Sequence, residues 1–190
     1  HLAYGKSISC ERLTEIFFEL EKKGAHNINL VSPTPYIKAL ASVIRQAKHL
    51  GLKIPVVFNS SGYESVSSLK LLDGLVDVYL PDFKNMSPSL SLKYSLAPDY
   101  PRAAMESLDE MISQSPRPVL DGDGMLRRGV IVRHLVLPGC TDDSKEVIRY
   151  LSERYGNSIY ISIMSQYTPM CNEEKYPELN RRLRQDEYDE

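Results

Sequence analysis

Five short apolar segments are spaced along the chain, and each of them runs directly into polar residues. They cover residues 27–31, 54–58, 76–80, 129–137 and 159–164. Near-continuous apolar strands separated by amphipathic helices are typical of a parallel sheet covered by helices. In such folds, ligands bind at the carboxyl ends of the strands. We therefore predict an α/β fold, an open partial (βα) barrel of the TIM-barrel type, with its site at that edge.

Helices are predicted where apolar residues repeat at helical spacing between capping residues. They cover residues 11–23, 36–50, 65–72, 87–114 with a break at 97–101, and 144–155, and a last helical segment begins near 177. The expected caps include Ser9, Thr34 and the pair Asp142 and Asp143. These assignments give the alternation of strand and helix that an α/β fold requires.

The segment 121–124, Asp-Gly-Asp-Gly, has the composition of a calcium loop. Such a loop needs a bidentate Glu eleven residues after its first Asp, and Val132 stands there. A hairpin turn between residues 119–120 and 125–126 is the preferred interpretation.

Length and charge limit the classes of function. At 190 residues and 42% apolar content, one compact domain is expected. A net charge of −2 supplies no basic field for nucleic acid or an anionic membrane, and no apolar run reaches the roughly 18 residues that span a bilayer. We expect a cytoplasmic protein with reduced thiols at Cys10, Cys140 and Cys171, to which no chemistry is assigned. Both ends look truncated, and a first strand is expected upstream.

The segment 76–84 carries the strongest sign of a site. Its strand leads straight into Asp82 and Lys84, and unpaired charges in an interior cost several kcal/mol. They must face a ligand, each other or water. Arg133 and His134 lie within a strand, so one of them points inward and needs a partner, for which Asp82 or a ligand carboxylate is suited.

Two further polar segments are ambiguous. Asn59 and Ser61 belong to an Asn-Ser-Ser-Gly segment that a simple turn explains equally well. Ser32 follows another predicted strand. The residues directly after it are explained by helix capping alone, so Ser32 is the freer candidate for a site.

Taken together, several segments resemble radical S-adenosylmethionine proteins, and most closely the homologues of pyruvate formate-lyase activating enzyme. The matching segments are residues 24–34, 59–64, 79–84, 133–139 and 164–170, so the resemblance covers nearly the whole chain. It implies a partial (βα)6 barrel in which a [4Fe-4S] cluster binds S-adenosylmethionine and one electron yields a 5′-deoxyadenosyl radical that abstracts hydrogen from a substrate. Family members act on small molecules or on proteins such as glycyl radical enzymes.

The resemblance also assigns residues to the cofactor site. They are Ser32, Asn59, Ser61, Asp82, Lys84, Arg133 and Gln166. The family holds its cluster with three cysteines in a C-x3-C-x2-C loop before the first helix, and this spacing does not occur in the chain. The cluster ligands are therefore expected outside it, and the chain by itself is expected to be inactive. The family's Gly-Gly-Glu is replaced by Ser32-Pro33-Thr34.

Two other functions remain open. One is a barrel lyase or aldolase in which Lys84, made nucleophilic by burial, forms a Schiff base. The other is a binding module that keeps a nucleoside pocket without chemistry.

Overall fold

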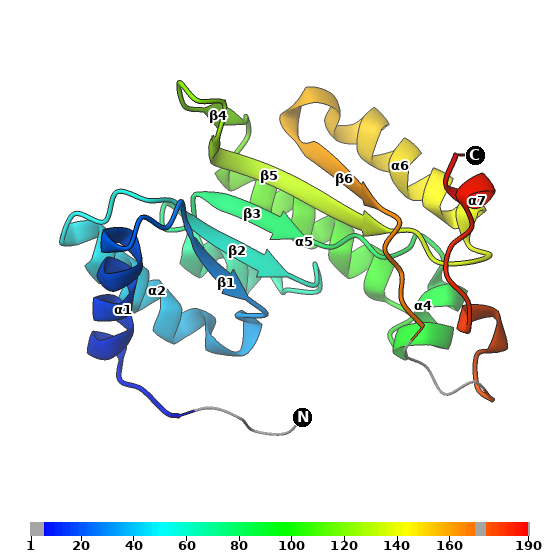
Figure 1. The fold of residues 1–190 in the computed structure, drawn as a ribbon, viewed down its shortest axis with the longest axis horizontal. Helices are drawn as coiled ribbons and strands as arrows, with labels where there is room; N and C mark the ends of the chain where they lie inside the picture. The colour runs from blue at the N-terminus through cyan, green and yellow to red at the C-terminus, as the bar shows by residue number, and fades with distance from the viewer. Residues whose placement is uncertain (1–5, 170–173, 190) are drawn as a thin grey trace.

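A curved, mostly parallel sheet forms the centre of the protein. The computed structural model describes residues 6–169 and 174–189. Its strands are β1 (Ile28–Val31), β2 (Val56–Ser60), β3 (Val78–Pro81), β4 (Val119–Leu120), β5 (Leu126–Leu135) and β6 (Tyr160–Met164). β1, β2, β3, β5 and β6 pair in that order and are all parallel, while the short β4 pairs antiparallel with β5. The five predicted strands, their parallel pairing and the 119–126 hairpin are thus confirmed (Figure 1).

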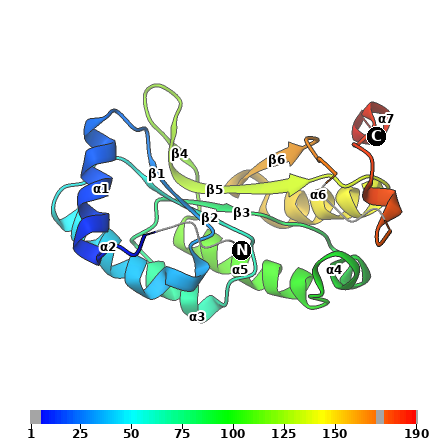
Figure 2. The same cartoon turned by 60° about the horizontal axis from the view of Figure 1, so that its bottom comes forward.

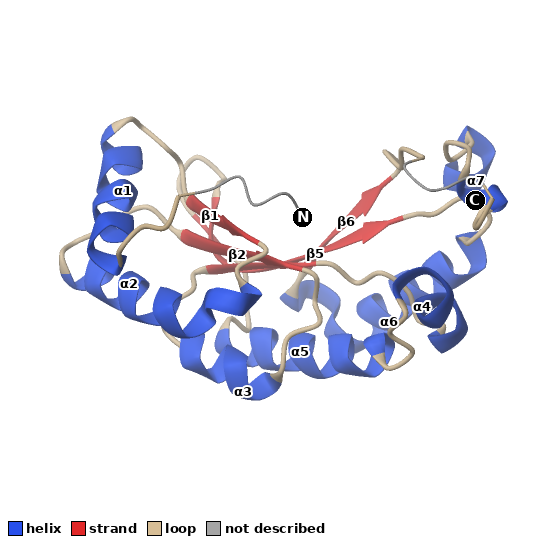
Figure 3. Ribbon diagram, turned by 90° about the horizontal axis from the view of Figure 1, so that it is seen from below, coloured by secondary structure: helices blue, strands red, loops and turns tan. Residues whose placement is uncertain are grey.

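Helices cover one face of this sheet. They are α1 (Cys10–Lys22), α2 (Ile37–His49), α3 (Val66–Leu69), α4 (Pro88–Ser95), α5 (Tyr100–Gln114), α6 (Thr141–Tyr155) and α7 (Gln185–Asp189). Short 3-10 turns occupy Thr34–Tyr36, Lys70–Leu72, Gly156–Ser158 and Pro177–Leu179. α2, α3, α5 and α6 lie along the convex face, and α1 and α7 flank the two ends of the sheet (Figures 2 and 3). The concave face is therefore the one that these four helices leave uncovered.

The predicted helices are present, but two predicted caps were wrong. Ser9 accepts a hydrogen bond from Arg12 N at 3.1 Å and caps α1 as expected. The Thr34 hydroxyl makes no capping bond and instead donates to Glu64. α6 begins at Thr141, so Asp142 and Asp143 lie in its first turn rather than at its cap. The helical segment expected at Pro177 is a single 3-10 turn.

Alternate residues of the central strands face opposite sides of the sheet. The side that packs on the helices carries Phe58, Tyr79, Val130 and Val132, each with no exposed surface. Burying about 25 cal/mol per Å² of apolar surface makes this layer the main source of stability. Among the described residues, no helix combines the length and apolar character that a bilayer span requires.

Candidate functional site

Three polar side chains meet on the concave face, at the carboxyl ends of three neighbouring strands. Arg133 Nη2 lies 2.7 Å from Asp82 Oδ1 and donates to Asn59 Oδ1 at 2.8 Å. Asp82 and Arg133 are also register partners, and Phe83 N donates to Arg133 O at 2.9 Å. The predicted convergence of Asn59, Asp82 and Arg133 is confirmed.

A hollow of about 420 Å³ opens beside this cluster. It is lined by Asp82, Phe83, Lys84, Asn85, Tyr94, Ser95, Arg133, Leu135, Leu137, Met164 and Gln166. Four of the predicted site residues, Asp82, Lys84, Arg133 and Gln166, thus border a single cavity. Asn59 is 9% exposed and joins this group through its hydrogen bond with Arg133. The wall combines charged and amide groups with an apolar side, which suits a ligand with both polar and apolar parts.

Arg133, not Lys84, is the ion-pair partner that Asp82 finds in the structure. The side chains of Arg133 and Asp82 are 27% and 28% exposed, so water partly screens their attraction, and such a pair contributes on the order of 1 kcal/mol. Lys84 is exposed. The burial on which a Schiff-base role for Lys84 depended is therefore absent.

Ser32 and Ser61 lie at the same edge of the sheet but outside the lining of this cavity. Ser32 N donates to Asn59 O at 2.9 Å, and its φ of 51° places it in the left-handed region. Its side chain borders a separate hollow beside Val31 and Tyr36. The Ser61 side chain is exposed, and its carbonyl accepts a hydrogen bond from Tyr100 at 2.9 Å. The structure thus brings five of the seven predicted residues together and sets these two apart.

A buried carboxylate supports the loops after β1 and β2. Glu64 is 3% exposed and accepts hydrogen bonds from Thr34 Oγ1 at 2.7 Å and Ser60 Oγ at 2.9 Å. Ser60 Oγ in turn accepts from Gly62 N at 3.4 Å. Glu64 was not among the predicted site residues, although a Glu four residues after a strand-end Ser was a usable signal.

The loop that carries Lys84 is held from behind by His134 and Asp143. His134 is 1% exposed on the helix-covered face, and its Nδ1 lies 2.7 Å from Phe83 O, which makes Nδ1 the protonated nitrogen. Asp143 accepts from Met86 N at 3.1 Å and from Ser87 N at 2.8 Å. Arg133 thus points to the cavity and His134 away from it, as alternation along the strand predicts.

Burial acts on the pKa values of both supporting groups. It lowers the pKa of His134 because the charged imidazolium is poorly solvated there, although the bond to Phe83 O and the charge of Asp143 oppose this. Burial raises the pKa of Asp143, against the amide hydrogen bonds from Met86 and Ser87 that favour its charged form.

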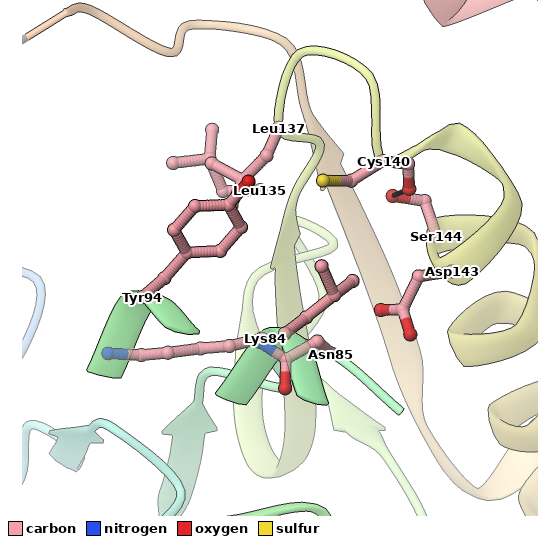
Figure 4. A pocket seen from close by; sticks show the side chains of 9 residues that line it. Lys84, Asn85, Tyr94, Leu135, Leu137, Cys140, Asp143 and Ser144 are labelled. Atoms are coloured by element: carbon pink, nitrogen blue, oxygen red, sulfur yellow. Dashed lines mark hydrogen bonds between the residues drawn. The ribbon is translucent and has the colours of Figure 1, made fainter. Parts of the chain in front are cut away.

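Tyr94 forms one side of the cavity and was also missed. Its hydroxyl donates to Glu178 Oε1 at 2.8 Å, and burial, followed by this bond, raises the pKa of Tyr94 to about 12. Behind it, Tyr94 and Cys140 border a second hollow of about 10 Å³, the size of one water molecule. Figure 4 shows this hollow, with the Lys84 nitrogen pointing away from Cys140.

The cysteines provide no metal site in the described part of the chain. Cys10 is exposed, and Cys140 is half-buried with a pKa raised mainly by burial. Cys171 lies outside the described residues. Within residues 6–169 and 174–189, no group of three or more His, Cys, Asp or Glu side chains is placed to bind a metal ion.

Comparison with known proteins gives a relative but no family assignment. No family model matches the chain. An uncharacterized protein of Methanocaldococcus jannaschii is 33% identical to it over 164 residues, which are 85% of this chain and 43% of that protein. The chain therefore spans less than half the length of the curated relative that it matches.

Proposed function

We propose that the protein is a radical S-adenosylmethionine enzyme resembling pyruvate formate-lyase activating enzyme, that its curved sheet is a partial (βα) barrel, and that the cavity beside Arg133 binds S-adenosylmethionine. The observation that carries this proposal is the meeting of Asn59, Asp82 and Arg133 at the carboxyl ends of three parallel strands. Ligands of α/β folds bind at that edge.

The cavity has the chemical groups that this cofactor needs. Arg133 at the base and Lys84 at the rim are cations suited to the methionine carboxylate. Asp82 and Gln166 offer oxygen acceptors for the amino group and the ribose hydroxyls. Leu135, Leu137 and Met164, together with the Tyr94 ring, form an apolar wall against which an adenine ring packs. At about 420 Å³, the volume lies within the range of ligand pockets.

The described residues do not fit a [4Fe-4S] cluster, because they contain no cysteine triplet and no other group of metal-binding side chains. No redox step is therefore assigned to them, and the ligands of the cluster are expected elsewhere in the protein. In enzymes of this kind, S-adenosylmethionine supplies the radical that abstracts hydrogen from the substrate. This chain's own part is to bind the cofactor, to orient it and to keep water from it.

Calorimetry with S-adenosylmethionine tests the binding role. Arg133→Met removes the guanidinium and should weaken binding at least tenfold, which corresponds to about 1.4 kcal/mol. Arg154→Met is the matched control, since Arg154 pairs with Asp109 at 2.7 Å outside the cavity. No binding by the unmodified chain, or equal binding by Arg133→Met, would contradict the proposal. Adenosine binding as tight as that of S-adenosylmethionine would favour the nucleoside-binding module.

The proposed radical chemistry has a separate test. A longer coding sequence for the protein should contain three closely spaced cysteines within about 20 residues upstream of the first helix, a distance of little more than one strand and a loop. A longer sequence without them would contradict the radical mechanism while leaving the binding result untouched.

A further inference from the structure

The hydroxyl of Tyr100 lies between the two loops that carry the site. It is 2.9 Å from Ser61 O in the loop after β2, and 3.1 Å from both Asp82 O and Lys84 N in the loop after β3. Tyr100 is 4% exposed. A single buried hydroxyl therefore contacts three backbone groups of two segments that lie about twenty residues apart in the sequence.

These contacts use the full capacity of the hydroxyl. Its one proton goes to either Ser61 O or Asp82 O, while its oxygen accepts the N–H of Lys84. Tyr100 is the first residue of α5, and its ring packs against that of Tyr63 with centroids 5.7 Å apart. The position of the hydroxyl is thus set by a helix that belongs to neither loop.

The two loops have no room to move toward each other. Gly62 has a φ of 75°, and a Cβ added there would lie 2.2 Å from Asp82 O and 3.4 Å from the Tyr100 hydroxyl. Gly62 therefore lies close to the Asp82 carbonyl, and the Tyr100 hydroxyl bonds to both loops beside this point of close approach.

We propose that Tyr100 is a positioning residue. Its hydroxyl holds the backbone near Asn59 and Asp82 in place, so that both side chains can accept hydrogen bonds from the guanidinium of Arg133. Tyr100 is not among the residues that line the cavity, and it acts through Asp82 rather than on a ligand. The geometric part of this inference stands alone, and only the identity of the ligand rests on the proposed function.

Tyr100→Phe removes the hydroxyl and keeps the ring. Tyr79→Phe is the matched control, because Tyr79 is fully buried and its hydroxyl donates to Gln114 on the helix-covered face. Both variants lose one buried hydroxyl, so a general loss of stability affects both. An effect on the site is expected only for Tyr100→Phe.

The first measurement needs no ligand. The Nη2–H signals of Arg133 in a 1H–15N spectrum, assigned through their loss in Arg133→Lys, report on its bonds to Asp82 and Asn59, because Nη2 makes both bonds. In Tyr100→Phe we expect these protons to exchange with water about threefold faster, which corresponds to a weakening of about 0.7 kcal/mol in the pairing. In Tyr79→Phe they should be unchanged. Unchanged signals in Tyr100→Phe, or equal changes in both variants, would overturn the inference.

The second measurement is the affinity for S-adenosylmethionine, which should fall about tenfold in Tyr100→Phe and less than twofold in Tyr79→Phe. If the unmodified chain does not bind S-adenosylmethionine, the proposed function fails, and the Arg133 signals still decide the role of Tyr100. If Tyr100→Phe does not fold, amide exchange of the unmodified chain decides instead: Lys84 N–H must be protected, and rapid exchange there would refute the role.

Discussion

A side chain on Gly62 would collide with the backbone of Asp82, since its Cβ would lie 2.2 Å from the Asp82 carbonyl oxygen. The φ of Gly62, 75°, belongs to the left-handed region, where residues with a Cβ are strained. The collision shows that the loops after β2 and β3 approach each other closely at this point. Gly62 therefore allows the loop after β2 to approach the Asp82 backbone more closely than a residue with a Cβ would.

Gly62→Ala should lower the free energy of unfolding by about 2–4 kcal/mol, the sum of left-handed strain and a forced displacement of the Asp82 backbone. Urea denaturation measures this. Gly74→Ala is the control, because Gly74 has a similar φ of 70° with nothing within 4 Å of an added Cβ. It should cost only about 1–2 kcal/mol, the strain alone. Equal losses in the two variants would mean that the close approach to Asp82 is not a constraint.

Glu64 should tolerate an isosteric change far better than a truncation. Glu64→Gln keeps one acceptor for Thr34, and the Ser60 hydroxyl can rotate to accept from the new amide, so a loss below about 1 kcal/mol is expected. Glu64→Ala removes a buried side chain and leaves the buried Ser60 hydroxyl without its partner, which should cost about 2–4 kcal/mol, while the exposed Thr34 hydroxyl can bond to water. Denaturation curves of the two variants give the comparison. A cost for Gln as large as that for Ala would show that the negative charge itself is required.

The alternation of strands and helices could be predicted because each element carries its own periodicity. Val130 and Val132 face the helices and Ile131 faces the other side, and this period of two is visible in the sequence. Ser9 as a cap of α1 could be predicted for the same reason, since the cap and the amide that it accepts from are three residues apart. Local signals of this kind need no knowledge of the fold.

The partners of the charged groups could not be assigned, because they come from other elements. Thr34 looked like a cap and bonds to Glu64, thirty residues away. Asp143 looked like a cap of its own helix and instead accepts from the backbone of Met86 and Ser87. Tyr94 and Tyr100 could not be predicted for the same reason. They lie on α4 and α5, and they reach the site only because these helices pack beside the loop after β3.

The buried imidazole of His134 should make stability depend on pH. Burial lowers its folded pKa below the unfolded value, so the unfolded chain binds the proton more readily. Its contribution is fully present above about pH 6.5, the usual value for His, and is lost as pH falls from there toward the folded pKa, by at most about 1.4 kcal/mol per pH unit. Urea unfolding at pH 7.5 and 5.5 measures the slope.

His134→Asn tests the origin of that slope. Its amide can keep the donor to Phe83 O, and it has no proton to gain, so the variant should lose part of the pH dependence. Asp143 has a raised pKa, which makes stability fall as pH rises through its own transition. Because His134 and Asp143 act on each other's pKa, the difference between the two proteins measures His134 together with this coupling. An unchanged slope in His134→Asn would assign the pH dependence to other groups.

Lys84 should not form a Schiff base. Its side chain is exposed at the rim of the cavity and lacks the burial that would favour a neutral, nucleophilic amine. Borohydride reduction in the presence of candidate aldehydes, followed by peptide mass mapping, should therefore label Lys84 no more than exposed lysines outside the cavity such as Lys38. Selective labelling of Lys84, abolished by Lys84→Arg, would instead establish the lyase or aldolase alternative.

In the proposed function, Lys84 acts as a cation at the rim of the cavity. Lys84→Met should therefore weaken S-adenosylmethionine binding less than Arg133→Met does. The loss of affinity should also become smaller as added salt screens the exposed charge.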